Sequence, residues 1–141
     1  MTSLAAAHAA VTLAMAGIIW YVQIVHYPLF RAVGREAFPA FHARHTRRTG
    51  WVVGPLMLAE AAAAGALVLA DPWGFSPRAL LPWAGIALLA LVWTSTWAIQ
   101  VPLHARLAAA YDERTAGTLE RTNWIRTAGW TARAAVAIAL L

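Results

Sequence analysis

The chain has 141 residues, of which 61% are hydrophobic and 12% are charged. A soluble domain carries about 25% charged residues, so the composition argues against a soluble globular protein. All 11 basic residues are arginines, and the net charge is +5. Beside apolar segments, such charge is typical of membrane topology signals and anionic lipid contacts, which argues against nucleic-acid binding. The absence of cysteine excludes disulfides and thiolate metal ligands.

Four apolar runs account for this composition. They cover residues 4–25, 51–70, 79–101 and 123–141. Each is close to the length of about 20 residues that a helix needs to cross a bilayer core. No basic residue precedes the first run, so we expect it to remain as a helix rather than to be cleaved as a signal peptide. The sequence therefore predicts one all-α domain in the lipid bilayer, a four-helix transmembrane bundle.

The expected helices take in the ends of these runs and cover about 4–30, 51–70, 79–111 and 123–141. Residues 31–50, between the first two, are rich in arginine. Around Pro39 this segment is expected to form a short interfacial helix or an extension of the second helix.

The arginines also predict an orientation. Nearly all of those outside the apolar runs lie in the first and third loops, whereas the second loop has only Arg78 and the N-terminal tail has none. The positive-inside rule then places both long loops in the cytoplasm and both termini outside it. The expected location is the inner (cytoplasmic) membrane.

A weak internal repeat links the first and third helices. The pattern W-x-x-Q-x-x-H that begins at Trp20 recurs as W-x-x-Q-x-x-x-H from Trp97. Two repeated helical hairpins related by an axis along the membrane normal would produce this pattern. Chance matching in a chain rich in tryptophan and alanine would produce it as well, and both explanations remain open.

Polar side chains gather near the expected cytoplasmic end of the bundle. They are Gln23, His26, Gln100, His104, Asn123 and Arg126. Each glutamine precedes its histidine by three or four residues, so in a regular helix the pair shares one face. Polar groups at membrane depth survive only against protein or in a wet cavity. These residues are therefore expected to line a polar pocket that opens to the cytoplasm.

Two charges lie deeper in the apolar runs. Glu60 is near the middle of the second run and Arg133 lies within the fourth. A lone charge at that depth costs about 2.5 to 3.5 kcal/mol on insertion scales, so the two are expected to pair. The pair is either a structural contact between two helices or part of the chemistry, with Glu60 as a proton carrier or metal ligand.

The histidines are candidates for a metal or haem site. His26 and His104 are the expected cofactor ligands, and His42 and His45 are spaced so that both reach one ion if their segment is helical. Solvation at the membrane interface explains His42 and His45 equally well. His8 lies at the opposite end and is expected to be a packing residue.

Two short segments resemble a known family. They are Gln100-Val-Pro-Leu-His104 and Asn123-Trp-Ile-Arg126-Thr127, and they are similar to motifs of the anthrone oxygenase-like family of small four-helix membrane proteins. This chain carries His104 where that family usually has Asn, and Trp124 where His is common. The resemblance implies the four-helix fold and an oxygenase that acts on aromatic polyketides.

The leading hypothesis is a membrane oxidoreductase or oxygenase with a small hydrophobic substrate. Iron, copper, zinc or haem would be held by His26 and His104, with His42 or His45 adding a ligand. Catalytic roles in orienting imidazoles and moving protons are expected for Glu60, Gln23, Gln100, Asn123 and Arg126. The alternatives are a small transporter or proton pathway, and a non-catalytic membrane subunit. Each is compatible with an oligomer.

Overall fold

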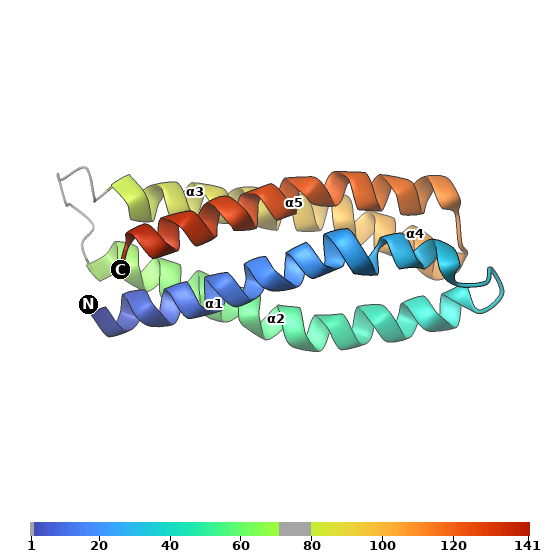
Figure 1. Cartoon of the computed structure of the whole chain (residues 1–141), viewed down its shortest axis with the longest axis horizontal. Helices are drawn as coiled ribbons and strands as arrows, with labels where there is room; N and C mark the ends of the chain where they lie inside the picture. Colours follow the sequence, from blue (N-terminus) through green and yellow to red (C-terminus); the bar gives the residue numbers. More distant parts are fainter. Residues whose placement is uncertain (1, 71–79) are drawn as a thin grey trace.

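The computed structural model describes residues 2–70 and 80–141, and within them it is helical with no β-strand (Figure 1). The elements are α1 (Thr2–Tyr21), η1 (Val22–His26), η2 (Pro28–Ala32), α2 (Phe38–Ala70), α3 (Leu80–Ser95), η4 (Thr96–Gln100), α4 (Val101–Ala109) and α5 (Glu113–Ala139). They form an elongated bundle in which α5 packs against α1 and α3. The predicted all-α class is confirmed.

Three helical stretches of the described chain are long and apolar enough to cross a membrane. They cover Ser3–Ala32, Phe38–Ala70 and Leu80–Ala109. These stretches support a membrane protein. The predicted fourth span is not among them, because α5 carries arginines and glutamates along much of its length.

The predicted bounds were wrong at two places. α2 is one continuous helix from Phe38 and does not begin near residue 51. Of the two forms expected around Pro39, the extension of the second helix is therefore confirmed and the separate interfacial helix is not found. This arginine-rich extension is stable because it buries Phe38 and His42 completely, and Phe38 belongs to an apolar cluster with Phe30 and Leu107.

α5 likewise begins at Glu113 and not near residue 123. Its N-cap is Asp112, whose Oδ2 accepts hydrogen bonds from the backbone N–H of Thr115 at 2.7 Å and from its hydroxyl at 2.6 Å. These bonds lower the pKa of the Asp112 carboxyl. The first turns then bury Ala116 and Leu119 in the cluster that contains Phe30.

The bundle has four long helical rods: α1–η1–η2, α2, α3–η4–α4 and α5. Two π-helical segments interrupt the first and third of these rods. Both η1 and η4 end two residues before a proline, Pro28 and Pro102. A proline removes a backbone donor and its ring clashes with the carbonyl four residues earlier. The wider π turn makes room for that carbonyl, and single π turns are frequent at functional sites.

The core is apolar in the middle of the bundle and the outside is apolar as well. Met15, Val92 and Trp130 are fully buried there, whereas Trp51 and Leu69 are more than 70% exposed. A large exposed apolar surface is typical of helices that face lipid. α3 and α5 approach closely, since a Cβ built on Gly129 would lie 2.5 Å from Cγ1 of Val92.

Candidate functional site

Four histidines from three rods of the bundle meet at the end opposite the two termini. His26 is the last residue of η1, His42 and His45 lie on α2, and His104 lies on α4. The ring centres are 4.4 Å apart for His26 and His45, 5.1 Å for His42 and His104, and 5.7 Å for His45 and His104. The predicted ligand pair is therefore part of a larger cluster, and His42 and His45 join it.

The imidazoles are hydrogen-bonded to one another. Nε2 of His26 lies 2.8 Å from Nδ1 of His45, and Nε2 of His42 lies 2.9 Å from Nδ1 of His104. Two hydroxyl groups extend the network: Tyr27 at 3.0 Å from Nε2 of His104, and Thr49 at 3.1 Å from Nδ1 of His45. Nδ1 of buried His42 has no partner among the described residues.

The cluster has the donor set of a metal site, although its nitrogens are closer together than in a metal-bound one. Imidazoles bound at about 2.0 to 2.1 Å to one tetrahedral ion have nitrogens about 3.3 Å apart and ring centres about 5 Å apart. The ring centres match this spacing. The nitrogen pairs at 2.8 and 2.9 Å would have to separate slightly. Accordingly, no group of three potential ligands in residues 2–70 and 80–141 is already arranged to hold an ion.

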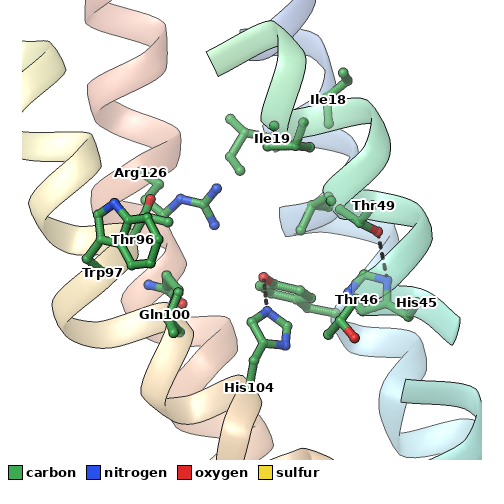
Figure 2. A pocket seen from close by; sticks show the side chains of 16 residues that line it. Ile18, Ile19, His45, Thr46, Thr49, Thr96, Trp97, Gln100, His104 and Arg126 are labelled. Atoms are coloured by element: carbon green, nitrogen blue, oxygen red, sulfur yellow. Dashed lines mark hydrogen bonds between the residues drawn. The ribbon is translucent and has the colours of Figure 1, made fainter. Parts of the chain in front are cut away.

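A pocket of about 450 Å³ adjoins the histidines (Figure 2). Its polar lining includes Tyr27, His45, Gln100, His104 and Arg126. The volume lies within the range of about 300 to 1,000 Å³ that is usual for small-molecule sites. Two of the predicted catalytic residues, Gln100 and Arg126, therefore share a cavity with two of the predicted ligands.

The other predicted polar residues form a network beside this pocket. Oε1 of Gln23 accepts hydrogen bonds from Nδ2 of Asn123 at 3.0 Å and from the hydroxyl of Thr127 at 3.3 Å. Oδ1 of Asn123 in turn accepts a bond from Nη1 of Arg126 at 3.2 Å. Asn123 thus holds Arg126 in place.

The predicted pairing of Gln23 with His26 was wrong. Gln23 is directed to α5, where its Nε2 also donates to the backbone carbonyl of Glu120 at 3.1 Å. A π turn takes more residues than an α turn, so residues three apart in η1 no longer lie on one face. Gln100 donates to Thr122 at 3.4 Å and not to His104, although both line the pocket.

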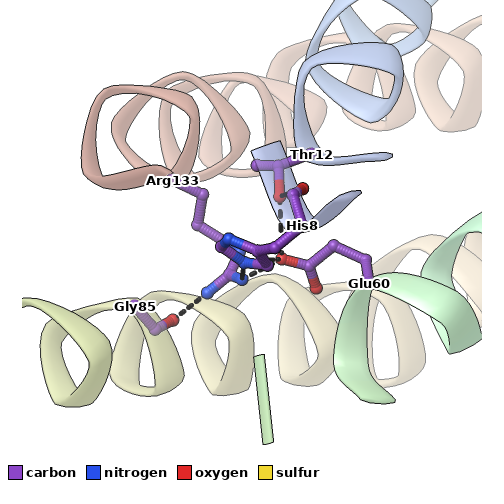
Figure 3. A network of polar contacts seen from close by, with 5 residues as sticks. All are labelled: His8, Thr12, Glu60, Gly85 and Arg133. Carbon is purple, nitrogen blue, oxygen red and sulfur yellow. Dashed lines mark hydrogen bonds and ion pairs between the residues drawn. The ribbon is translucent and has the colours of Figure 1, made fainter. Parts of the chain in front are cut away.

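A second polar cluster lies near the other end of the bundle (Figure 3). Nη2 of Arg133 is bonded to Oε1 of Glu60 and Nη1 to the carbonyl of Gly85. His8 lies 3.1 Å from Nη2 of Arg133, and the Thr12 hydroxyl lies 3.3 Å from Oε1 of Glu60. The predicted pairing of Glu60 with Arg133 is confirmed, and both side chains are fully buried.

Glu60 is therefore remote from the histidine cluster. It lies about 22 Å further along α2 than His45, at about 1.5 Å per residue. The apolar core around Met15, Met57 and Trp130 lies between the two levels. This position makes Glu60 a partner of Arg133 and gives it no contact with the pocket.

Sequence reasoning missed Tyr27, Thr49 and Thr12. Thr49 follows His45 by one helical turn, which was a usable signal. Thr12 follows His8 by one turn in the same way, and its hydroxyl donates to the His8 carbonyl at 2.8 Å. Tyr27 gave no such signal, because its partner His104 lies on another helix. His8 was expected to be a packing residue, and it contributes to the network around Arg133.

Compared with known proteins, the chain matches no family model, no curated protein and no solved structure.

Proposed function

We propose that this protein is an integral membrane oxidoreductase of the oxygenase type, with one metal ion held by His26, His42, His45 and His104. The observation that carries this proposal is the meeting of four imidazoles beside a pocket of about 450 Å³. The resemblance of residues 100–104 and 123–127 to the anthrone oxygenase-like family agrees with it.

The proposal includes a four-span bundle. From Trp124 onward the exposed side of α5 is largely apolar, with Trp124, Ile125 and Ile138 facing outward. Arg126 and Arg133 are buried on its inner side and lower its hydropathy without meeting lipid. A helix of this kind can cross a membrane when its charges are enclosed by protein.

The exposed tryptophans support a position of the histidines near one membrane interface. Trp20, Trp51, Trp97 and Trp124 are exposed on the four rods of the bundle, as in an aromatic belt at one interface. His26, His45 and His104 lie about 9 to 10 Å beyond this belt along their helices. The arginine-rich first loop is at the same end, so the site faces the cytoplasm by the positive-inside rule.

The donor set favours a metal ion over haem. Four neutral imidazoles suit iron, copper or zinc. Haem held by His26 and His104 fits less well, because each of these rings is hydrogen-bonded to a histidine of α2. A bound iron or copper ion would supply oxygen and one-electron chemistry that side chains lack.

The chain's own groups would prepare the site. Tyr27 holds the ring of His104 in position through a hydrogen bond at Nε2 and leaves Nδ1 for the ion, as the hydrogen-bonding partners of metal ligands generally do. Thr49 shares Nδ1 of His45 with His26, so it would have to release this nitrogen to an ion bound there. The pocket receives the substrate beside His104 and His45. Its mostly apolar lining disfavours bulk water on that side of the rings.

Elemental analysis of the purified protein tests the proposal. Wild-type protein expressed with iron, copper and zinc supplied should retain about one ion per chain. His42→Ala and His104→Ala should each lose most of it, whereas His8→Ala, in the remote polar cluster, should retain it. Metal-free wild type, or equal retention by all three variants, would remove the basis for the proposed function.

A proton pathway is the second candidate, and the direct bonds between imidazoles favour it. Tyr27, His104 and His42 form a chain along which a proton can pass. Wild-type protein in liposomes should then conduct protons down an imposed gradient, and His104→Ala should not. A tightly bound metal would exclude this role, because ligand nitrogens cannot carry protons.

A further inference from the structure

In the described part of the chain, Arg126 is a buried cation without an anionic partner. Only 6% of its surface is exposed. The guanidinium contacts neutral groups: Nη1 donates to the amide of Asn123, and the Tyr27 hydroxyl lies beside it. Nε has no partner among the described residues. Within residues 2–70 and 80–141 no carboxylate lies within ion-pairing distance of it, in contrast to Arg133, which is paired with Glu60. A buried charge is costly unless it is paired, so Arg126 would bind an anion favourably.

The guanidinium group points into the pocket. Figure 2 shows it directed into the space between Ile19 and His104. Oε1 of Gln100, which lines the same space, also has no partner among the described residues. A donor on Arg126 and an acceptor on Gln100, both without a partner among the described residues, therefore line the same pocket.

The remainder of the pocket wall is mostly apolar, and its rim reaches the outside of the bundle. Ile18, Ile19 and Val53 line the part further from the histidines. Gly50 and Trp97, on α2 and η4, also line it and are exposed on the outside of the bundle. A ligand could therefore enter sideways from the membrane at the level of the tryptophans.

We propose that the pocket binds a membrane-soluble carboxylic acid, with its carboxylate on Arg126 and its hydrocarbon body against Ile18, Ile19 and Val53. A planar guanidinium matches a carboxylate in shape and charge. Arg126 is the one arginine among the lining residues described, so the pocket can balance about one negative charge. A carboxylate matches this charge better than a phosphate monoester, which carries about 1.5 to 2 negative charges. As a statement about the substrate, this inference rests on the oxidoreductase function proposed above.

Binding of radiolabelled dodecanoate to the full-length protein in phosphatidylcholine nanodiscs tests the inference. Dodecanoate should bind at least about tenfold more tightly than dodecanol, because a hydrogen bond to a charged group changes the affinity by about tenfold or more. Dodecyl phosphate should bind more weakly than dodecanoate. Equal binding of the acid and the alcohol would overturn the inference, and tighter binding of the phosphate would overturn the choice of a carboxylate.

Two variants locate the site. Arg126→Gln should abolish the preference for the acid over the alcohol, and Arg121→Gln, at an exposed position on the same helix, should keep it.

Gly54→Leu should block both ligands, because Gly54 lines the pocket and a Cβ there meets no described atom within 4 Å. Gly65→Leu is its matched control, since Gly65 is also half-buried on α2 with the same free space and is not among the lining residues. Unchanged binding by Gly54→Leu would overturn the inference even if Arg126→Gln failed to fold.

Metal analysis of the same samples separates the two proposals. If wild type is metal-free but binds dodecanoate through Arg126, the oxidoreductase function fails and the carboxylate site stands. If wild type holds a metal and shows no preference for the acid, the metal site stands and the carboxylate site fails.

Discussion

Arg133 on α5 and Glu60 on α2 form an ion pair in which neither side chain has any exposed surface. The guanidinium also donates to the carbonyl of Gly85 on α3, and His8 of α1 lies beside both charges. One charged pair thus connects all four rods of the bundle. Because the pair is buried beside the apolar core, removing either charge would leave the other buried and unpaired.

Glu60→Gln should therefore lower the free energy of unfolding by about 3 to 5 kcal/mol, because it leaves Arg133 buried and unpaired. Glu60→Gln combined with Arg133→Met should recover most of that loss. Reversible unfolding in detergent measures both. Glu120→Gln is the control, since Glu120 pairs at 2.7 Å with a half-exposed Arg31, and exposed pairs contribute about 0 to 1 kcal/mol. Additive losses in the double variant would show that the pair is not coupled.

Gly129→Ala should destabilise the contact between α3 and α5. The added methyl group would lie 2.5 Å from Cγ1 of Val92, and such overpacking costs about 1 to 3 kcal/mol. Val92→Ala in the same chain should relieve part of the loss by removing the clashing methyl. Gly17→Ala on α1 should be harmless, because its methyl meets no described atom within 4 Å. A melting temperature unchanged by Gly129→Ala would contradict the close packing.

Tyr27→Phe should weaken metal binding without abolishing it. The hydroxyl lies 3.0 Å from Nε2 of His104, and removing a hydrogen-bonding partner of a metal ligand typically costs about 10- to 100-fold in affinity. Competition with a chelator of known affinity measures the change. Tyr111→Phe provides the control, since Tyr111 packs on Phe38 in the same end of the bundle. Equal affinity of Tyr27→Phe and wild type would mean that His104 does not bind the ion.

Reporters fused after Leu141 should be active only outside the cytoplasm, and reporters inserted between Val33 and Ala37 only inside it. The physical reason is the excess of arginine in the first and third loops. Alkaline phosphatase and a fluorescent protein at both positions provide the readout. A fluorescent C-terminal fusion would reverse the proposed orientation, and it would place the histidine cluster on the outer side.

The bundle was largely predictable from hydropathy. Runs of apolar residues predicted which segments form long apolar helices. Three of the predicted segments coincide with helices long and apolar enough to cross a membrane. The helix ends were predicted poorly, because Phe38, Ala116 and Leu119 stabilise them through contacts distant in sequence. Local patterns contain no information about such contacts.

The sequence predicted which residues belong to the candidate site, and it predicted only some of the contacts between them. His26 and His104 were chosen for their position beside glutamines, whereas in the structure each bonds to a histidine of α2. The π turn in η1 rotates Gln23 toward Asn123 and away from His26. Sequence spacing assumes a regular helix, so it cannot anticipate this change of face.

The sequence by itself determined the helical class, the apolar exterior and the pairing of Glu60 with Arg133, because burial of a charge in an apolar run demands a partner. Only the tertiary structure decided that four histidines meet, that Arg126 points into a pocket with no carboxylate of the described residues beside it, and that Glu60 lies far from both. Those outcomes depend on how each helix is rotated about its own axis and shifted against its neighbours. Packing between helices sets both quantities, and hydropathy along one helix constrains neither.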